Sequence, residues 1–213
     1  MREKVPSIMS YATSNNIDII LIQETWIRKC DSFIINKINE YGFSVKTERK
    51  SLSLEWGGGV AFIYKAGLNV KHVKSCNKFE TFEHVTCSVL TEDGPLFIVS
   101  LYRRGYSTTN RFTVNQFCIE FTQLLQDLNY TVNPIMIAGD LNIHLELLNS
   151  DIVNPSYYLS SKISNMMGGS VFLGGHPTVE ITLLGEPPNL SFFKGSPSRR
   201  NYAFGGAAKL RLF

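Results

Sequence analysis

The chain has 213 residues, of which 44% are hydrophobic, 18% are charged and 12% are aromatic. This length and composition predict one globular domain, or one domain plus a tail, and they exclude a collagen, a coiled coil and a disordered polymer. The 21 basic and 18 acidic residues leave a net charge of only +3, which by itself does not indicate a nucleic-acid partner.

The first elements predicted along the chain are a helix and two strands. Apolar residues recur at helical spacing from Val5 to Ala12, with Pro6 tolerated in the first turn. The run IDIILIQ, residues 17–23, is almost continuously apolar and rich in β-branched residues, which is typical of a strand buried on both faces. A glycine run at 57–59 then leads into a strand at 60–64.

The next elements are a hairpin, a helix and another strand. Strands at 82–90 and 96–102 flank the turn sequence TEDGP and are expected to pair antiparallel. A helical apolar stripe covers residues 117–128, and Thr113-x-x-Gln116 provides a capping box before it. The strand PIMIA then leads into Gly139-Asp140-Leu141-Asn142. This order predicts an α/β sandwich of mixed sheets.

The composition changes towards the end of the chain. A helix is expected from Asn154-Pro155 to about Gly168, and a strand at 178–184. Residues 168–213 hold half of the glycines and half of the prolines, and their charged residues account for the whole net charge of +3. We therefore predict a domain over 1–167 and a basic, Gly/Pro-rich tail over 168–213 that is less well packed.

The cysteines and the first residues indicate a cellular compartment. Cys30, Cys76, Cys87 and Cys118 form no CxxC pair and have no histidine at zinc-ligand spacing, so we expect free thiols in a reducing environment. The start MREKVPS lacks the apolar core of a secretory signal, and no apolar run approaches the ~20 residues that span a bilayer. We expect an intracellular protein, nuclear or cytoplasmic, with no transmembrane segment.

Polar side chains follow three of the predicted strands. Gln23-Glu24 ends the first strand, Tyr102-Arg103 ends the second hairpin strand, and Asp140 and Asn142 follow PIMIA. Strand ends of this kind commonly line the active sites of α/β folds. Two carboxylates, an amide and a phenol would suit a magnesium–phosphate site, because Mg²⁺ prefers oxygen ligands. The alternative for each residue alone is a polar loop residue that caps a strand.

Five sequence blocks occur in an order that is recognisable: IDIILIQETW, WGGGVAFIY, FEHVTCSVL, LFIVSLYR and IMIAGDLNIH. Together they resemble the endonuclease/exonuclease/phosphatase superfamily, with its DNase I-like and exonuclease III-like fold. More narrowly, they are similar to the endonuclease domains of non-LTR retrotransposons. The resemblance covers residues 4–150 and implies a four-layer α/β sandwich that cleaves DNA with Mg²⁺ or Mn²⁺.

The resemblance implies a role for each matching residue. Glu24 matches the metal-binding glutamate, and Tyr102 matches a tyrosine whose hydroxyl would donate a hydrogen bond to the phosphorane. Asp140 matches an aspartate that positions or activates the attacking water, and Asn142 matches an asparagine that contacts the phosphate.

Three further residues have two interpretations each. Arg103 and Arg104 either contact the nucleic-acid backbone, since arginine is the usual fork for phosphate oxygens, or form a solvated loop pair. Trp26 either stacks on a base or ribose or packs into the core.

Both ends of the family pattern are missing from the sequence. An initial strand with a supporting asparagine is absent, and no Ser-Asp-His block follows residue 150. Loss of one member of a cooperative catalytic unit commonly costs several orders of magnitude in rate. A non-catalytic, truncated relic that binds nucleic acid weakly is therefore the alternative to an active DNA endonuclease. A small-molecule phosphatase is a third hypothesis. No obligate protein partner is predicted.

Overall fold

The structure is a computed structural model that describes residues 2–27, 31–50, 58–91, 94–105, 111–128 and 135–141, and the backbone of four short strands beyond them. The helices are η1 (Arg2–Lys4), α1 (Val5–Ser14), α2 (Ser32–Glu40) and α3 (Val114–Asp127). The longer strands are β1 (Ile19–Gln23), β2 (Phe43–Glu48), β3 (Val60–Lys65), β4 (Val70–Val73), β5 (Glu83–Thr91), β6 (Gly94–Tyr102) and β7 (Ile135–Asp140). The short strands are β8 (Gly185–Glu186), β9 (Asn189–Leu190), β10 (Tyr202–Ala203) and β11 (Lys209–Leu212).

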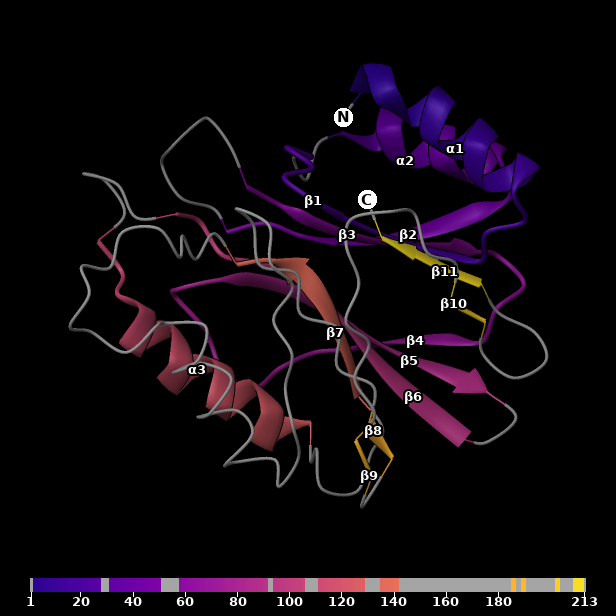
Figure 1. Ribbon diagram of the computed structural model, residues 1–213. Coiled ribbons are helices and arrows are strands. Elements are labelled where there is room, and N and C mark those ends of the chain that lie inside the picture. The colour runs from indigo at the N-terminus through magenta and orange to yellow at the C-terminus, as the bar shows by residue number, and fades with distance from the viewer. Residues whose placement is uncertain are drawn as a thin grey trace, which may run out of the picture.

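Two mixed sheets form the centre of the fold (Figure 1). The first has the strand order β10-β11-β1-β3-β2 and the second has the order β4-β5-β6-β7. In the second sheet β5 and β6 pair antiparallel, whereas β6 and β7 run parallel, so that Tyr102 lies opposite Asp140. This parallel pair brings two strand ends to the same edge of the sheet.

The layers follow from three clusters of buried apolar side chains. One cluster, which includes Leu21, Phe62 and Val85, lies between the two sheets. Helices α1 and α2 cover the outer face of the first sheet, and α3 covers the outer face of the second (Figure 1). Helix, sheet, sheet and helix make the predicted four-layer α/β sandwich, and the expected fold class is confirmed.

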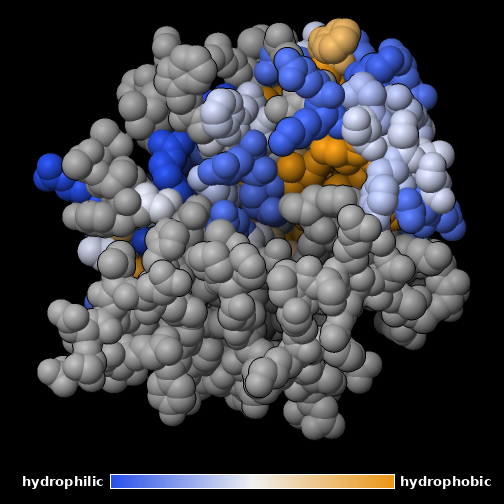
Figure 2. Space-filling view, turned by 45° about the horizontal axis from the view of Figure 1, so that its top comes forward, coloured by the Kyte–Doolittle hydropathy of each residue, from blue (hydrophilic) through white to orange (hydrophobic). Residues whose placement is uncertain are grey.

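The surface on the side of α1 and α2 is largely hydrophilic over the described residues, with a compact hydrophobic patch among them (Figure 2). Large hydrophobic side chains that are exposed in the described part of the chain are Trp26, Phe33, Leu90 and Ile119. Within the same residues, no helix is both long and apolar enough to cross a membrane.

Most predicted elements in the first 141 residues are confirmed. The helix at the start, the strands at the centre of both sheets and the capped helix α3 form where expected, and Thr113 and Gln116 make the reciprocal capping bonds. Three short elements, α2, β2 and β4, were not predicted. The reason is physical: α2 buries only Ile34 and Ile38, and β2 and β4 lie at sheet edges where the apolar pattern is weak.

The predicted tail is described only in part. The helix expected from Asn154 and the strand expected at 178–184 lie outside the described residues. The backbone of β11 pairs in parallel with β1, and Ile19 lies opposite Leu210 (Figure 1). A segment of the predicted tail therefore adds to the first sheet. The domain boundary at residue 167 stays a prediction.

Candidate active site

Three strand ends from both sheets bring together the polar residues singled out in the sequence. Glu24 directly follows β1, Tyr102 ends β6 and Asp140 ends β7. The amide of Gln23 donates to Ser100 Oγ at 3.2 Å, which ties the end of β1 to β6 in the other sheet. Glu24 and Tyr102, which lie 78 positions apart in the sequence, thus share one edge of the sandwich with Asp140.

A hydrogen bond joins the side chains of Tyr102 and Glu24. The Tyr102 hydroxyl donates to Glu24 Oε1 at 2.5 Å. Burial raises the pKa of Tyr102, and the hydrogen bond to Glu24 and the negative charges of Glu24 and Asp140 raise it further, whereas Arg104 acts in the opposite direction. Tyr102 therefore stays protonated at neutral pH and is a permanent hydrogen-bond donor at this edge.

The segment after β1 has an unusual backbone. Glu24 has φ 52° and Trp26 has φ 56°, which is the left-handed region that non-glycine residues rarely adopt. Thr25 N donates to Gly59 O at 3.1 Å and Trp26 N donates to Gly58 O at 3.0 Å. These two backbone hydrogen bonds hold the strained turn in place. Strain of about 1–3 kcal/mol per residue persists where the surroundings fix it, and it is common at functional sites.

The facing glycines cannot be replaced without disturbing this turn. Gly58 and Gly59 have φ 78° and 94°. A Cβ on Gly59 would lie 2.5 Å from Thr25 Oγ1, which is closer than real Cβ contacts. The glycine run thus serves the close approach of two backbones rather than a phosphate loop.

Glu83 is a site residue that the sequence analysis missed. Its buried carboxylate accepts hydrogen bonds from Gly59 N and from Lys50 N, the latter at 3.2 Å. It also lies directly opposite Tyr102 in the β5–β6 pair. Glu83 therefore fixes the Gly58–Gly59 turn and, through it, the position of Glu24. The available signal was a carboxylate at the start of an otherwise apolar strand.

The two adjacent arginines have different surroundings. Arg103 is 2% exposed, and its guanidinium donates to the carbonyl oxygens of Leu141 and Phe112, each at 3.2 Å. It also lies over the Phe117 ring. Arg103 thus ties the end of β6 to α3 and to the residue after β7, and it is not a solvated loop residue.

Arg104 lies nearer to the candidate site. A Cβ on Gly58 would lie 3.2 Å from its Nη2 atom and 2.9 Å from Glu83 Oε1. The guanidinium is therefore beside the strained turn.

Trp26 does not pack into the core. It is 49% exposed, so the core-packing interpretation is wrong and the indole is accessible next to Glu24. Asn142 lies outside the described residues, and its role stays a prediction.

Comparison with solved structures shows the same fold in proteins of low identity. The catalytic domain of human nocturnin with bound sulfate matches with a TM-score of 0.52 and 17% identity over 68% of this chain and 59% of that one. An AP endonuclease from Archaeoglobus fulgidus matches with a TM-score of 0.50 and 16% identity over 78% of this chain and 66% of that one. A 3′ phosphatase from Neisseria bound to a product DNA hairpin matches with a TM-score of 0.51 and 12% identity over 76% of this chain and 66% of that one.

This chain therefore spans about three fifths to two thirds of the length of these structures. A comparison with curated proteins found no match.

The match to a family model covers almost the whole chain. The model described as the endonuclease/exonuclease/phosphatase family matches residues 4–207, which includes the candidate site and continues past residue 167. The resemblance to this superfamily is confirmed, whereas the closer similarity to retrotransposon endonucleases stays a proposal. With a matched range that covers far more than half of its length, the chain belongs to the endonuclease/exonuclease/phosphatase family.

Proposed function

We propose that this protein hydrolyses phosphodiester bonds in DNA with the help of a divalent cation, as a nicking endonuclease of the non-LTR retrotransposon type. The observation that carries the proposal is the hydrogen bond from Tyr102 to Glu24, next to Asp140 on the adjacent strand. A protonated hydroxyl and two carboxylates thus lie at the same edge of the sandwich, where strand ends of both sheets meet. The family membership supports phosphate-ester hydrolysis.

The donor set at this edge fits Mg²⁺ or Mn²⁺. Glu24 is exposed and Asp140 is half-buried, and Tyr102 occupies only one oxygen of Glu24. Among the described residues, no group of three or more His, Cys, Asp or Glu side chains is arranged so that it could hold a metal ion by itself. Mg²⁺ does not need such a cluster, because one or two carboxylates usually hold it together with waters and substrate phosphate. When bound, the cation would neutralise charge on the scissile phosphate.

The protein's own groups then have distinct tasks. Glu24 and Asp140 would hold the cation, and Asp140 would also accept a proton from the attacking water. The Tyr102 hydroxyl has a single proton, which Glu24 accepts in this structure. With a cation bound to Glu24, that proton would turn to the phosphate oxygen on which negative charge develops, which is where a donor lowers the barrier most. Asn142 contacts the same phosphate.

Arg104 and Trp26 are the proposed contacts to the nucleic acid. The Arg104 guanidinium beside Gly58 would pair with a backbone phosphate. The exposed Trp26 ring would stack on a base or ribose, a contact that tolerates any sequence. Arg103 has no part in this proposal, because its guanidinium already binds two backbone carbonyls.

A plasmid-nicking assay tests the proposal. We expect conversion of supercoiled to open-circular DNA with Mg²⁺ or Mn²⁺, no conversion in EDTA, and none by Glu24→Ala. Glu40→Ala is the matched control, because Glu40 is an exposed carboxylate on α2 whose partner is Lys37.

Nicking in EDTA, or by Glu24→Ala at the normal rate, would contradict the assignment of the site. A folded but inactive wild-type chain would favour the relic hypothesis. Release of phosphate from small phosphomonoesters without nicking would favour a phosphatase.

A further inference from the structure

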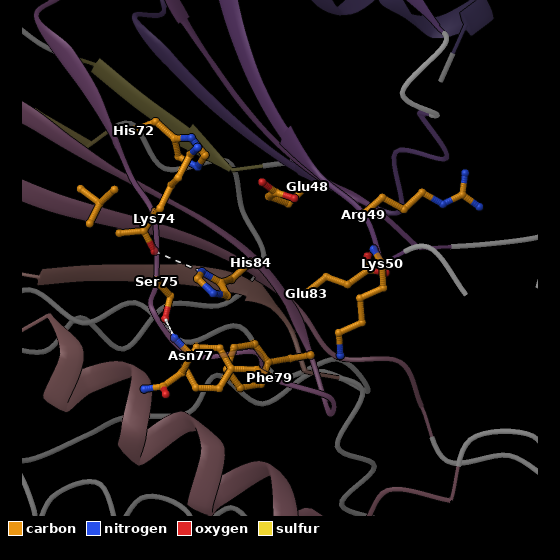
Figure 3. Close-up of a pocket in the computed structure, with 13 residues that line it drawn as sticks. Glu48, Arg49, Lys50, His72, Lys74, Ser75, Asn77, Phe79, Glu83 and His84 are labelled. Atoms are coloured by element: carbon orange, nitrogen blue, oxygen red, sulfur yellow. Dashed lines mark hydrogen bonds between the residues drawn. The ribbon is translucent and has the colours of Figure 1, made fainter. Parts of the chain in front are cut away.

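A hollow lies beside the candidate active site, at the open edge between the two sheets (Figure 3). It has a volume of about 470 Å³, within the usual range for small-molecule sites. Residues that follow β2 line one side and residues of β4, β5 and the loop between them line the other. Figure 3 shows Lys50 on one side of the hollow, His72, Lys74 and His84 on the other, and Glu83 between Lys50 and His84.

The pocket exists because two strands differ in length. The last β4–β5 pair is Val73 with Thr86, and β5 extends past it to Glu83. The sheet edge is thus open along the start of β5. Lys50 approaches this opening from the other sheet, where its backbone N–H donates to Glu83.

Helix α3 fixes the loop that forms the rim. Glu120 accepts hydrogen bonds from the backbone N–H groups of Glu80 and Thr81 at 2.9 and 2.8 Å. Asp127 accepts from Ser75 Oγ at 2.9 Å and from the side-chain amide of Asn77. The Glu120 and Asp127 carboxylates, which lie on the same face of α3, therefore hold the rim in a defined shape. A ligand would not have to order this loop on binding.

The charges that line the pocket favour an anion. Arg49, Lys50 and Lys74 are cationic, and Glu48 and Glu83 are carboxylates, which leaves one net positive charge. Two backbone N–H groups already bind the Glu83 carboxylate and offset its charge. Lys50 follows β2 and Lys74 follows β4, so the hollow is lined by lysines from two separate elements, whereas the Arg49 side chain points away from it (Figure 3).

The electrostatics of the lining groups agree with this assignment. Burial lowers the pKa of His84 to about 4, the positive charges of His72 and Lys50 lower it further, and Asp127 opposes them. Burial also lowers the pKa of Lys50, against the acidic neighbours Glu120, Glu83 and Glu80. The cationic forms in the pocket are thus costly without a counter-ion, which a bound anion would supply.

We propose that this pocket binds a phosphate group and is separate from the site of hydrolysis. Glu83 separates the two sites, because it lines the pocket and also lies opposite Tyr102 in the sheet. A phosphate in the pocket would therefore lie one side chain away from the candidate active site. That place suits a neighbouring phosphate of a bound nucleic-acid strand, and a free phosphate offers the same chemistry. Binding needs neither a metal nor hydrolysis, so this inference goes beyond the proposed function.

Titration with inorganic phosphate in EDTA, followed by the NMR signals of the His84 ring, tests the proposal on the full chain. We expect a saturable shift in the wild type and affinity lower by about tenfold or more in Lys50→Met/Lys74→Met, which loses two charge-assisted contacts. Lys74→Glu is a second variant, at an exposed position where the fold tolerates change. Lys71→Met is the matched control, since Lys71 is exposed on β4 and does not line the pocket.

The outcomes separate the possibilities. Absence of a saturable shift in the wild type, or an equal loss in Lys71→Met, would overturn the proposal. A parallel titration with a single-stranded oligonucleotide, also in EDTA, distinguishes the sources. Weaker oligonucleotide binding by the double variant supports a strand phosphate, and unchanged oligonucleotide binding with loss of inorganic phosphate supports a free one. Both titrations measure binding alone, so their results do not depend on whether the protein nicks DNA.

Discussion

The candidate active site and the phosphate pocket lie side by side but are built in opposite ways. The active site presents carboxylates and a phenol at strand ends, and the backbone hydrogen bonds of Gly58 and Gly59 fix its position. The pocket presents lysines and histidines along an open sheet edge, and α3 fixes its rim. Glu83 belongs to both regions. The contrast predicts that one region governs metal binding and hydrolysis, whereas the other governs the binding of phosphate without metal.

Removal of a carboxylate from the active site should have the largest effect. Glu24→Ala and Asp140→Ala should each lower the nicking rate roughly a thousandfold or more, because members of a catalytic unit fail together. Both variants should bind inorganic phosphate in the pocket as the wild type does. Initial nicking rates measure the loss of activity, and the phosphate titration measures whether binding in the pocket is unchanged. Loss of phosphate binding in either variant would show that the two regions are a single site.

Tyr102→Phe should have a smaller effect on the same reaction. It deletes one hydrogen bond to the developing charge, which is worth about 2–4 kcal/mol by analogy with a single oxyanion-hole donor. The metal ligands stay in place, so affinity for the cation should change little. Nicking rates at saturating metal measure this loss, and a variant as inactive as Glu24→Ala would show that the hydroxyl does more than donate one bond.

In the phosphate pocket, titration of His84 should make the stability of the protein depend on pH. The pKa of His84 is about 4 in the folded protein, whereas an unfolded histidine titrates near 6.5. The unfolded state therefore binds more protons between these values. The stability from a neutral His84 is complete above pH 6.5 and falls by up to about 3 kcal/mol as the pH drops to 4.

Urea unfolding at several pH values checks this, with His84→Gln as the reference that removes the titrating group. The difference in unfolding free energy between wild type and variant should change with pH over that window. A constant difference would contradict a buried, neutral histidine.

Glu83→Gln addresses the residue that the two regions share. The amide keeps the shape but replaces one acceptor oxygen with a donor that faces a backbone N–H. We expect a loss of about 2 kcal/mol of unfolding free energy, in line with a broken hydrogen bond to a charged group. Nicking should also fall, because the turn that positions Glu24 loosens. Glu80→Gln is the control, an exposed glutamate on the adjacent loop, and it should leave both measurements unchanged.

The sequence predicted those site residues that directly follow a strongly apolar strand. Glu24, Tyr102 and Asp140 each stand at the end of such a run, so their convergence could be predicted. Glu83 and the pocket could not, because their geometry depends on β2 and β4, short edge strands without a clear apolar pattern.

Arg103 and Trp26 illustrate a second limit of the sequence. The carbonyl oxygens of Phe112 and Leu141 that bind Arg103 come from two other parts of the chain, so its burial is a property of tertiary packing. Trp26 is exposed because the backbone turns into the left-handed region after β1, against the usual preference of a large apolar side chain for the core.

Cation binding tests most directly the central claim that Glu24 and Asp140 hold a metal ion beside the Tyr102 hydroxyl. A titration of the full chain with Mn²⁺, followed by water proton relaxation, reports binding without any substrate. We predict that the wild type and Glu40→Ala bind Mn²⁺ alike and that Glu24→Ala loses roughly tenfold or more in affinity, since even indirect changes at metal sites cost that much. Equal Mn²⁺ affinity in Glu24→Ala and the wild type would contradict the account.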